Sequence, residues 1–89
     1  MMFSDDDLVR VREMYKAGES PSQILRFFSV ARPAASVPHL MELLRDALGL
    51  PYEAVQCVGG WWHDGTGELS DDQLDALLKP AIRVALGNR

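Results

Sequence analysis

The sequence predicts an all-α protein: a compact single domain over residues 1–89, made of about five short helices, with a Gly/Trp-rich turn or mini-hairpin before the last helix. Apolar residues recur at three- and four-residue spacing along most of the chain, which is the period of a helix. Several of these stretches begin with serine and an acidic residue or glutamine, the pattern of a helix N-cap. A hydrophobic fraction of 47% and a charged fraction of 25% are typical of a globular domain.

The first helix is predicted to begin after Ser4 and to end near Gly18. Serine is a good N-cap, and the three aspartates that follow suit the positive end of the helix dipole. Phe3 and Leu8 occupy the two positions of a hydrophobic staple. Glycine readily adopts the backbone conformation that ends a helix. The expected apolar stripe comprises Leu8, Val11, Met14 and Tyr15.

A second helix is predicted from Pro21, because Ser20 and Gln23 form a capping box and proline suits the first helical position. Apolar residues cover most of its circumference, so we expect this helix to be largely buried. These residues are Ile24, Leu25, Phe27 and Phe28. Residues 29–36 are expected to form a loop, since proline and small residues there show no periodicity.

The third helix is predicted from about Val37 to Gly49 and has the clearest amphipathic pattern in the chain. Its apolar face comprises Leu40, Leu43, Leu44, Ala47 and Leu48, and His39 is expected in its first turn as a surface residue. A short fourth helix should follow Pro51 and end at the glycine pair of residues 59–60. Ala54, Val55 and Val58 should face inward from it.

The last helix is predicted to begin after Ser70, which forms a second capping box with Gln73. Its expected apolar face comprises Leu74, Leu77, Leu78, Ala81, Ile82 and Ala85. Pro80 lies too far inside this helix to act as a start, and proline removes a backbone donor there. We therefore expect a kink or a break into two pieces at Pro80.

The stretch over residues 59–69 holds both tryptophans and four of the seven glycines. Asp64 and Gly65 suit a tight hairpin turn, although an irregular loop is an equal alternative. Residues 62–73 also align with a calcium-binding EF-hand loop, but Trp62 and Gln73 stand where that loop needs carboxylates. We therefore predict no metal and no cofactor.

Catalysis has little support in the sequence. Cys57, His63 and Asp64 supply the residue types of a thiol nucleophile, its base and an orienting group. Such sites are assembled in space, so closeness along the chain is not evidence. Cys57 is expected on the short fourth helix beside the inward-facing Val58, and a buried cysteine usually behaves as a small apolar filler. We predict that the protein is not an enzyme. The single cysteine fits a reducing compartment, and no apolar run could span a bilayer, so a cytoplasmic location is expected.

Residues 11–30 resemble the first two helices of a resolvase-type helix-turn-helix. The resemblance implies a third helix near Arg32 that reads the major groove of DNA. Pro33 and Pro38 occupy that place, and a net charge of −4 repels phosphate backbones. Nucleic-acid binding is therefore the alternative function, and we regard a nucleic-acid partner as less favoured than a protein.

The preferred interpretation is a small, acidic, non-enzymatic module that binds a protein partner, such as an immunity or antitoxin-type inhibitor that binds a basic partner. Tryptophans surrounded by carboxylates make a plausible interface for a basic surface, although both rings could instead fill the core. Asp75 belongs to the same acidic run. The predicted partner-binding residues are Trp61, Trp62, His63, Asp64, Glu68, Asp71 and Asp72.

Overall fold

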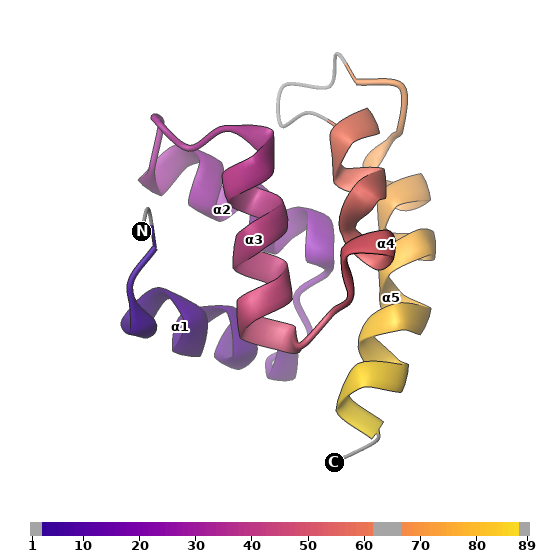
Figure 1. The fold of residues 1–89 in the computed structure, drawn as a ribbon, viewed down its shortest axis with the longest axis horizontal. Helices are drawn as coiled ribbons and strands as arrows, with labels where there is room; N and C mark the ends of the chain where they lie inside the picture. The colour runs from indigo at the N-terminus through magenta and orange to yellow at the C-terminus, as the bar shows by residue number, and fades with distance from the viewer. Residues whose placement is uncertain (1–2, 62–66, 88–89) are drawn as a thin grey trace.

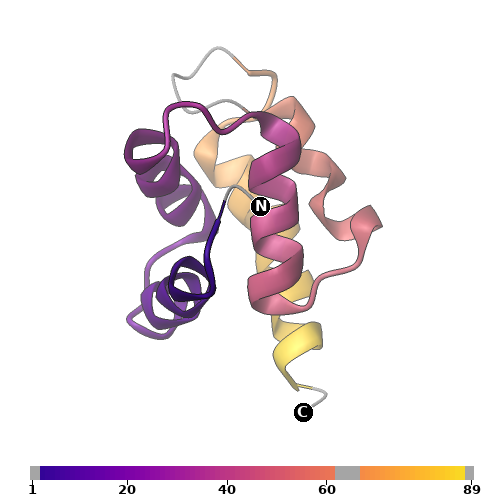
Figure 2. The ribbon, with the colours of Figure 1, turned by 60° about the vertical axis from the view of Figure 1, so that its left-hand side comes forward.

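Helix α3 lies at the centre of the molecule and contacts all the other helices (Figures 1 and 2). The computed structural model describes residues 3–61 and 67–87. The helices are α1 (Asp5–Lys16), α2 (Pro21–Ala31), α3 (Val37–Leu48), α4 (Tyr52–Val55), the 3-10 helix η1 (Gln56–Gly60) and α5 (Asp71–Gly87). Helices α1 and α2 lie on one side of α3, and α4 and α5 lie on the other (Figure 1). The all-α prediction is confirmed, and the five α-helices within the described ranges agree with the number predicted.

Serine caps set the starts of the four longer helices. Ser4, Ser20, Ser36 and Ser70 each stand immediately before a helix, and the residue three positions later bonds back to the serine backbone N–H. The pairing satisfies amide groups that the first helical turn cannot satisfy itself. At Ser36 the returning group is His39 Nδ1, at 3.0 Å. The caps predicted at Ser4, Ser20 and Ser70 are therefore present.

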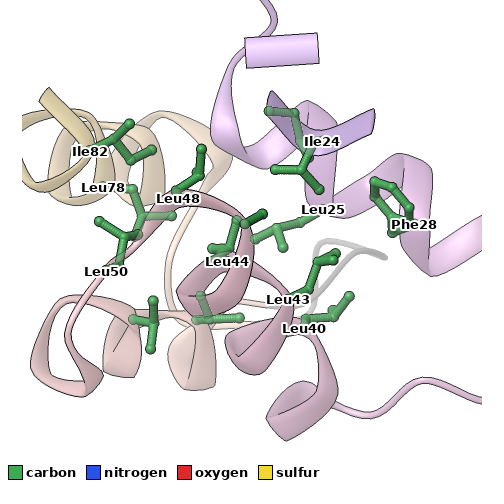
Figure 3. Close-up of a cluster of buried hydrophobic side chains, with 14 of the residues drawn as sticks. Ile24, Leu25, Phe28, Leu40, Leu43, Leu44, Leu48, Leu50, Leu78 and Ile82 are labelled. Atoms are coloured by element: carbon green, nitrogen blue, oxygen red, sulfur yellow. The ribbon is translucent and has the colours of Figure 1, made fainter. Parts of the chain in front are cut away.

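The core forms where α2, α3 and α5 meet, and their apolar faces converge there (Figure 3). Leu44 of α3 lies among side chains from α2 and is fully buried. The buried residues labelled in the figure are Ile24, Leu25, Phe28, Leu40, Leu43, Leu44, Leu48, Leu50, Leu78 and Ile82. Full burial of a leucine stabilises a fold by about 1.5–3 kcal/mol. The predicted apolar face of α3 is buried in full.

Two apolar residues expected in the core lie at the surface instead. Phe27 is 40% exposed and Leu77 is 53% exposed. Each immediately precedes a buried residue of its own helix, Phe28 in α2 and Leu78 in α5, and the neighbouring helices cover only the buried stripe. Helix α2 is therefore buried along one side rather than around most of its circumference, and the prediction for Phe27 and Leu77 is wrong.

The structure also corrects two boundaries. Helix α2 continues to Ala31, so residues 29–31 are helical rather than part of a loop, and Ser29 Oγ donates to the Leu25 carbonyl at 2.8 Å. Helix α5 is one element from Asp71 to Gly87, so it is not broken at Pro80. Pro80 and the residue four positions earlier, Ala76, are both exposed. Water can therefore bond to the Ala76 carbonyl, which loses its helical donor to the proline.

The domain has a radius of gyration of 11.8 Å, close to the roughly 12 Å expected of a compact chain of this length. In the parts that the structure describes, no helix is both long enough and apolar enough to cross a membrane.

Candidate functional site

Trp61 closes the core at the end of η1 and is 1% exposed. Its indole Nε1 donates to Asp71 Oδ1 at 2.8 Å. A single β-bridge joins Trp61 to Leu69, and the Leu69 amide donates to the Gly60 carbonyl at 2.8 Å. The structure thus places this tryptophan inside the molecule, where its ring supports the start of α5 and is not exposed to solvent.

Asp71 receives hydrogen bonds from two directions at the first turn of α5. Besides the Trp61 indole, Arg26 of α2 donates from Nη2 to both carboxylate oxygens, at 2.7 and 2.8 Å. The Arg26 guanidinium also lies 5.6 Å from the centre of the Trp61 ring, within cation–π range. The hydrogen bond from the indole is the largest cause that holds the pKa of Asp71 below its usual value, and the hydrogen bonds from Arg26 are the second. Asp71 is therefore already engaged within the chain.

Glu68 and Asp72 remain exposed beside this cluster. They line an open depression of about 610 Å³ together with Arg26 and residues 67–73. Neither forms an ion pair with any residue in the described ranges. Of the seven predicted partner-binding residues, Glu68, Asp71 and Asp72 are thus brought together around one depression, and Trp61 lies behind it.

Trp62, His63 and Asp64 lie outside the described residues, as do Gly65 and Thr66. The turn of the predicted mini-hairpin, the first five of the twelve positions of the EF-hand alignment and the His63–Asp64 part of the thiol hypothesis fall on these positions. Gln73, at the last position of that alignment, accepts a hydrogen bond from the Ser70 amide through Oε1 at 2.9 Å, so it serves the helix cap.

Asp75, grouped above with the surface acids, is instead a buried structural residue. It is 9% exposed and accepts two hydrogen bonds from Ser22 at the start of α2, one from the amide at 2.8 Å and one from Oγ at 3.0 Å. The carboxylate also lies at the positive end of the α2 dipole. One signal in the sequence could have revealed this role. Asp75 shares the helical stripe of Leu78 and Ile82, and a carboxylate on a buried stripe requires donors.

The sequence did not predict an exposed apolar face on α2. Val30 is 74% exposed and Phe27 is 40% exposed, and they lie three positions apart on the same side of the helix. Both line a depression of about 410 Å³ with Gln23, Arg26 and Ala31. A second depression, of about 400 Å³, lies between α1 and α2 and shares Phe27.

The acidic depression at α5, the apolar depression on α2 and the depression between α1 and α2 form one continuous surface. Phe27 joins the two depressions at α2, and Arg26 joins the α2 depression to the acidic one at α5. Over Phe27 lies the Arg10 guanidinium of α1, 5.6 Å from the ring centre. We call this surface the α2 strip. Its principal residues are Arg10, Arg26, Phe27, Val30, Glu68 and Asp72.

Cys57 lies half-buried in η1, and its thiol donates to the Ala54 carbonyl at 3.5 Å. Burial raises the pKa of this thiol, which keeps it protonated and poorly nucleophilic. Within the described ranges, no group of three or more His, Cys, Asp or Glu side chains is placed to hold a metal ion.

Comparisons of the chain with protein-family models, with curated proteins and with solved structures found no match.

Proposed function

We propose that this chain is a small, acidic, non-enzymatic protein-interaction module that binds a basic partner, in the manner of an immunity or antitoxin-type inhibitor. The observation that carries the proposal is the α2 strip, in which an exposed apolar centre is continuous with an acidic end. Protein interfaces have this anatomy, with a desolvating apolar centre and a polar border.

The centre of the strip supplies the side chains that desolvation favours. Phe27 and Val30 expose apolar surface, and the Arg10 and Arg26 guanidinium groups lie beside it. Aromatic and arginine side chains are enriched among the residues that dominate binding energy. A contiguous apolar patch bordered by charges is also more informative than single exposed apolar residues.

The acidic end of the strip supports a basic partner. Glu68 and Asp72 are exposed. The Asp71 carboxylate, which is bonded to Arg26, is half-exposed. The net charge of −4 gives the whole molecule the same sign as this end. Complementary charge increases the rate of association and selects among partners.

The helix-turn-helix alternative gains no comparable support. A recognition helix presents basic and polar side chains to the major groove. The exposed face of α3 instead carries Glu42 and Asp46 beside Arg45. We expect the protein to pass through a heparin or DNA column at low salt, and salt-dependent retention would favour the alternative.

Site-specific photo-cross-linking tests the proposed interface directly. A photoreactive phenylalanine analogue is placed at Val30 or at Asp72, in the strip, and at Val84 as the matched control. Val84 is a 63% exposed apolar residue of α5 that does not line the depressions of the strip. In cells that naturally express the protein, the strip positions should give one discrete protein adduct and the control should not. Adducts that are absent from the strip, or equally frequent at Val84, would refute the interface.

A further inference from the structure

We infer that the α2 strip accepts one amphipathic helix of the partner, with its apolar side on Phe27 and Val30 and a basic end against Glu68 and Asp72. This inference rests on the proposed function and specifies the form of the partner. Three properties of the strip lead to it: the path of its apolar residues, the state of its backbone and the distribution of its charge.

The apolar residues follow a single helix, so they form a narrow straight stripe. Phe27, Val30 and Ala31 recur at three- and four-residue spacing along the outer side of α2, and the polar Gln23 lies one turn before Phe27 on the same side. The depression between α1 and α2 runs beside this stripe and shares Phe27. A ridge next to a groove is the surface on which a second helix packs, with side chains spaced in the same way.

The backbone of the strip favours a helix over an extended peptide. A peptide that binds by strand addition needs unpaired N–H and C=O groups along a sheet edge. Apart from Glu68, the principal residues of the strip lie on α1, α2 and α5, and interior backbone groups of a helix bond within the helix. At the start of α2, the Ser22 and Gln23 amides are also bonded, to Asp75 and to Ser20 Oγ. Affinity must therefore come from side chains, as in helix-in-groove recognition.

The charges of the strip fix the orientation of the bound helix. At the α1 end, Asp7 pairs with Arg32 at 3.2 Å and Arg10 lines the same depression as Asp6 and Glu13, so three carboxylates stand with two arginines. At the α5 end, Glu68 and Asp72 have no described cationic partner, because Arg26 bonds to Asp71. The α5 end has one arginine, Arg26, for the three carboxylates Glu68, Asp71 and Asp72. A basic segment is thus attracted more strongly to the α5 end than to the α1 end.

The probe is a labelled synthetic helix of about 18 residues, long enough to retain helicity in water. It carries leucines on one face and lysines at one end. One control peptide has glutamates in place of the lysines, and a second has the same composition with the leucines dispersed around the helix. Fluorescence anisotropy measures binding to each protein. We expect the lysine probe to bind more tightly than both controls, and equal binding of the three peptides would overturn the inference.

Matched variants locate the binding. Val30→Glu and Glu68→Lys should each raise the Kd of the lysine probe about tenfold. Val84→Glu and Glu42→Lys repeat these changes at exposed positions outside the strip and should change it about twofold or less. Circular dichroism confirms that each variant is folded. Equal losses in strip and control variants would overturn the inference.

The outcomes separate this inference from the proposed function. Strip-specific cross-linking without binding of the lysine probe would leave the interface standing and refute the helical partner. Loss of both results would refute the function as well. Light scattering measures the molar mass and so tests whether a second copy of this chain occupies the strip. If the wild type is a dimer and Val30→Glu is a monomer, the strip binds a second copy and the inference is overturned.

Discussion

The buried contact between Asp75 and Ser22 should be one of the largest single polar contributions to stability. Replacing Asp75 with alanine removes the acceptor of both the Ser22 amide and its hydroxyl, and Ser22 is 1% exposed. A buried group left without a hydrogen bond costs about 1–3 kcal/mol. The hydroxyl keeps another partner in Ser20 Oγ, 3.2 Å away, but the amide does not. The loss of favourable charge at the α2 N-terminus adds about 0.3–1 kcal/mol.

We therefore expect Asp75→Ala to lower the free energy of unfolding by about 2–3 kcal/mol. That is a large share of the roughly 4–13 kcal/mol available to a domain of this length. It corresponds to a Tm lower by roughly 10–20 °C. Urea unfolding followed by circular dichroism measures the change directly.

Two further variants make the measurement specific. Asp75→Asn keeps one side-chain oxygen for the Ser22 amide and should cost about 1 kcal/mol. Asp72→Ala removes an exposed carboxylate from the same helical turn and should cost about 0.3–1 kcal/mol. If Asp75→Ala destabilises the protein no more than Asp72→Ala does, the assigned role of the buried contact is wrong.

Two other predictions concern α5. Because the folded-state pKa of Asp71 is depressed, its contribution to stability is present above the unfolded value of about 3.9 and is lost as pH falls through the folded value. The stability difference between wild type and Asp71→Asn in urea should therefore shrink below about pH 4, and a difference independent of pH would contradict this. Pro80→Ala should restore a donor for the exposed Ala76 carbonyl and stabilise the protein by about 2 kcal/mol, the roughly 3 kcal/mol cost of an interior proline less about 1 kcal/mol of unfolded-state entropy. An unchanged or lower Tm would show that the helix has already adapted to the proline.

The helix starts could be predicted because their signals are local. The caps at Ser4, Ser20 and Ser70 each depend on residues within one helical turn. Gly49 ends α3 with a φ of 72°, a conformation that glycine adopts at little cost. The stripe of α3 could also be identified, because four leucines and an alanine lie on one face of the helix and only that face can be buried with all of them inside.

The surface could not be predicted in the same way, because it depends on which elements meet. Phe27 is as apolar as Phe28, and only the packing of α2 against its neighbours leaves Phe27 exposed while Phe28 is buried. The sequence allowed Trp61 to be either buried or exposed. Its burial depends on the folded structure, which brings Asp71 within hydrogen-bond distance of the indole. The α2 strip depends on α1, α2 and α5 together, and no local pattern reports that arrangement.

The link between Ser22 and Asp75 has a consequence for the order of folding. The two residues are 53 positions apart, so the start of α2 gains its carboxylate only after α5 has docked. Closing a chain over that distance costs entropy before any contact repays it. During synthesis, α2 emerges with its Ser22 amide still lacking the Asp75 carboxylate, and the earlier helices emerge with an uncovered core face. We expect them to reach native stability only when α5 has left the ribosome, which makes α5 the element that commits the domain to its fold.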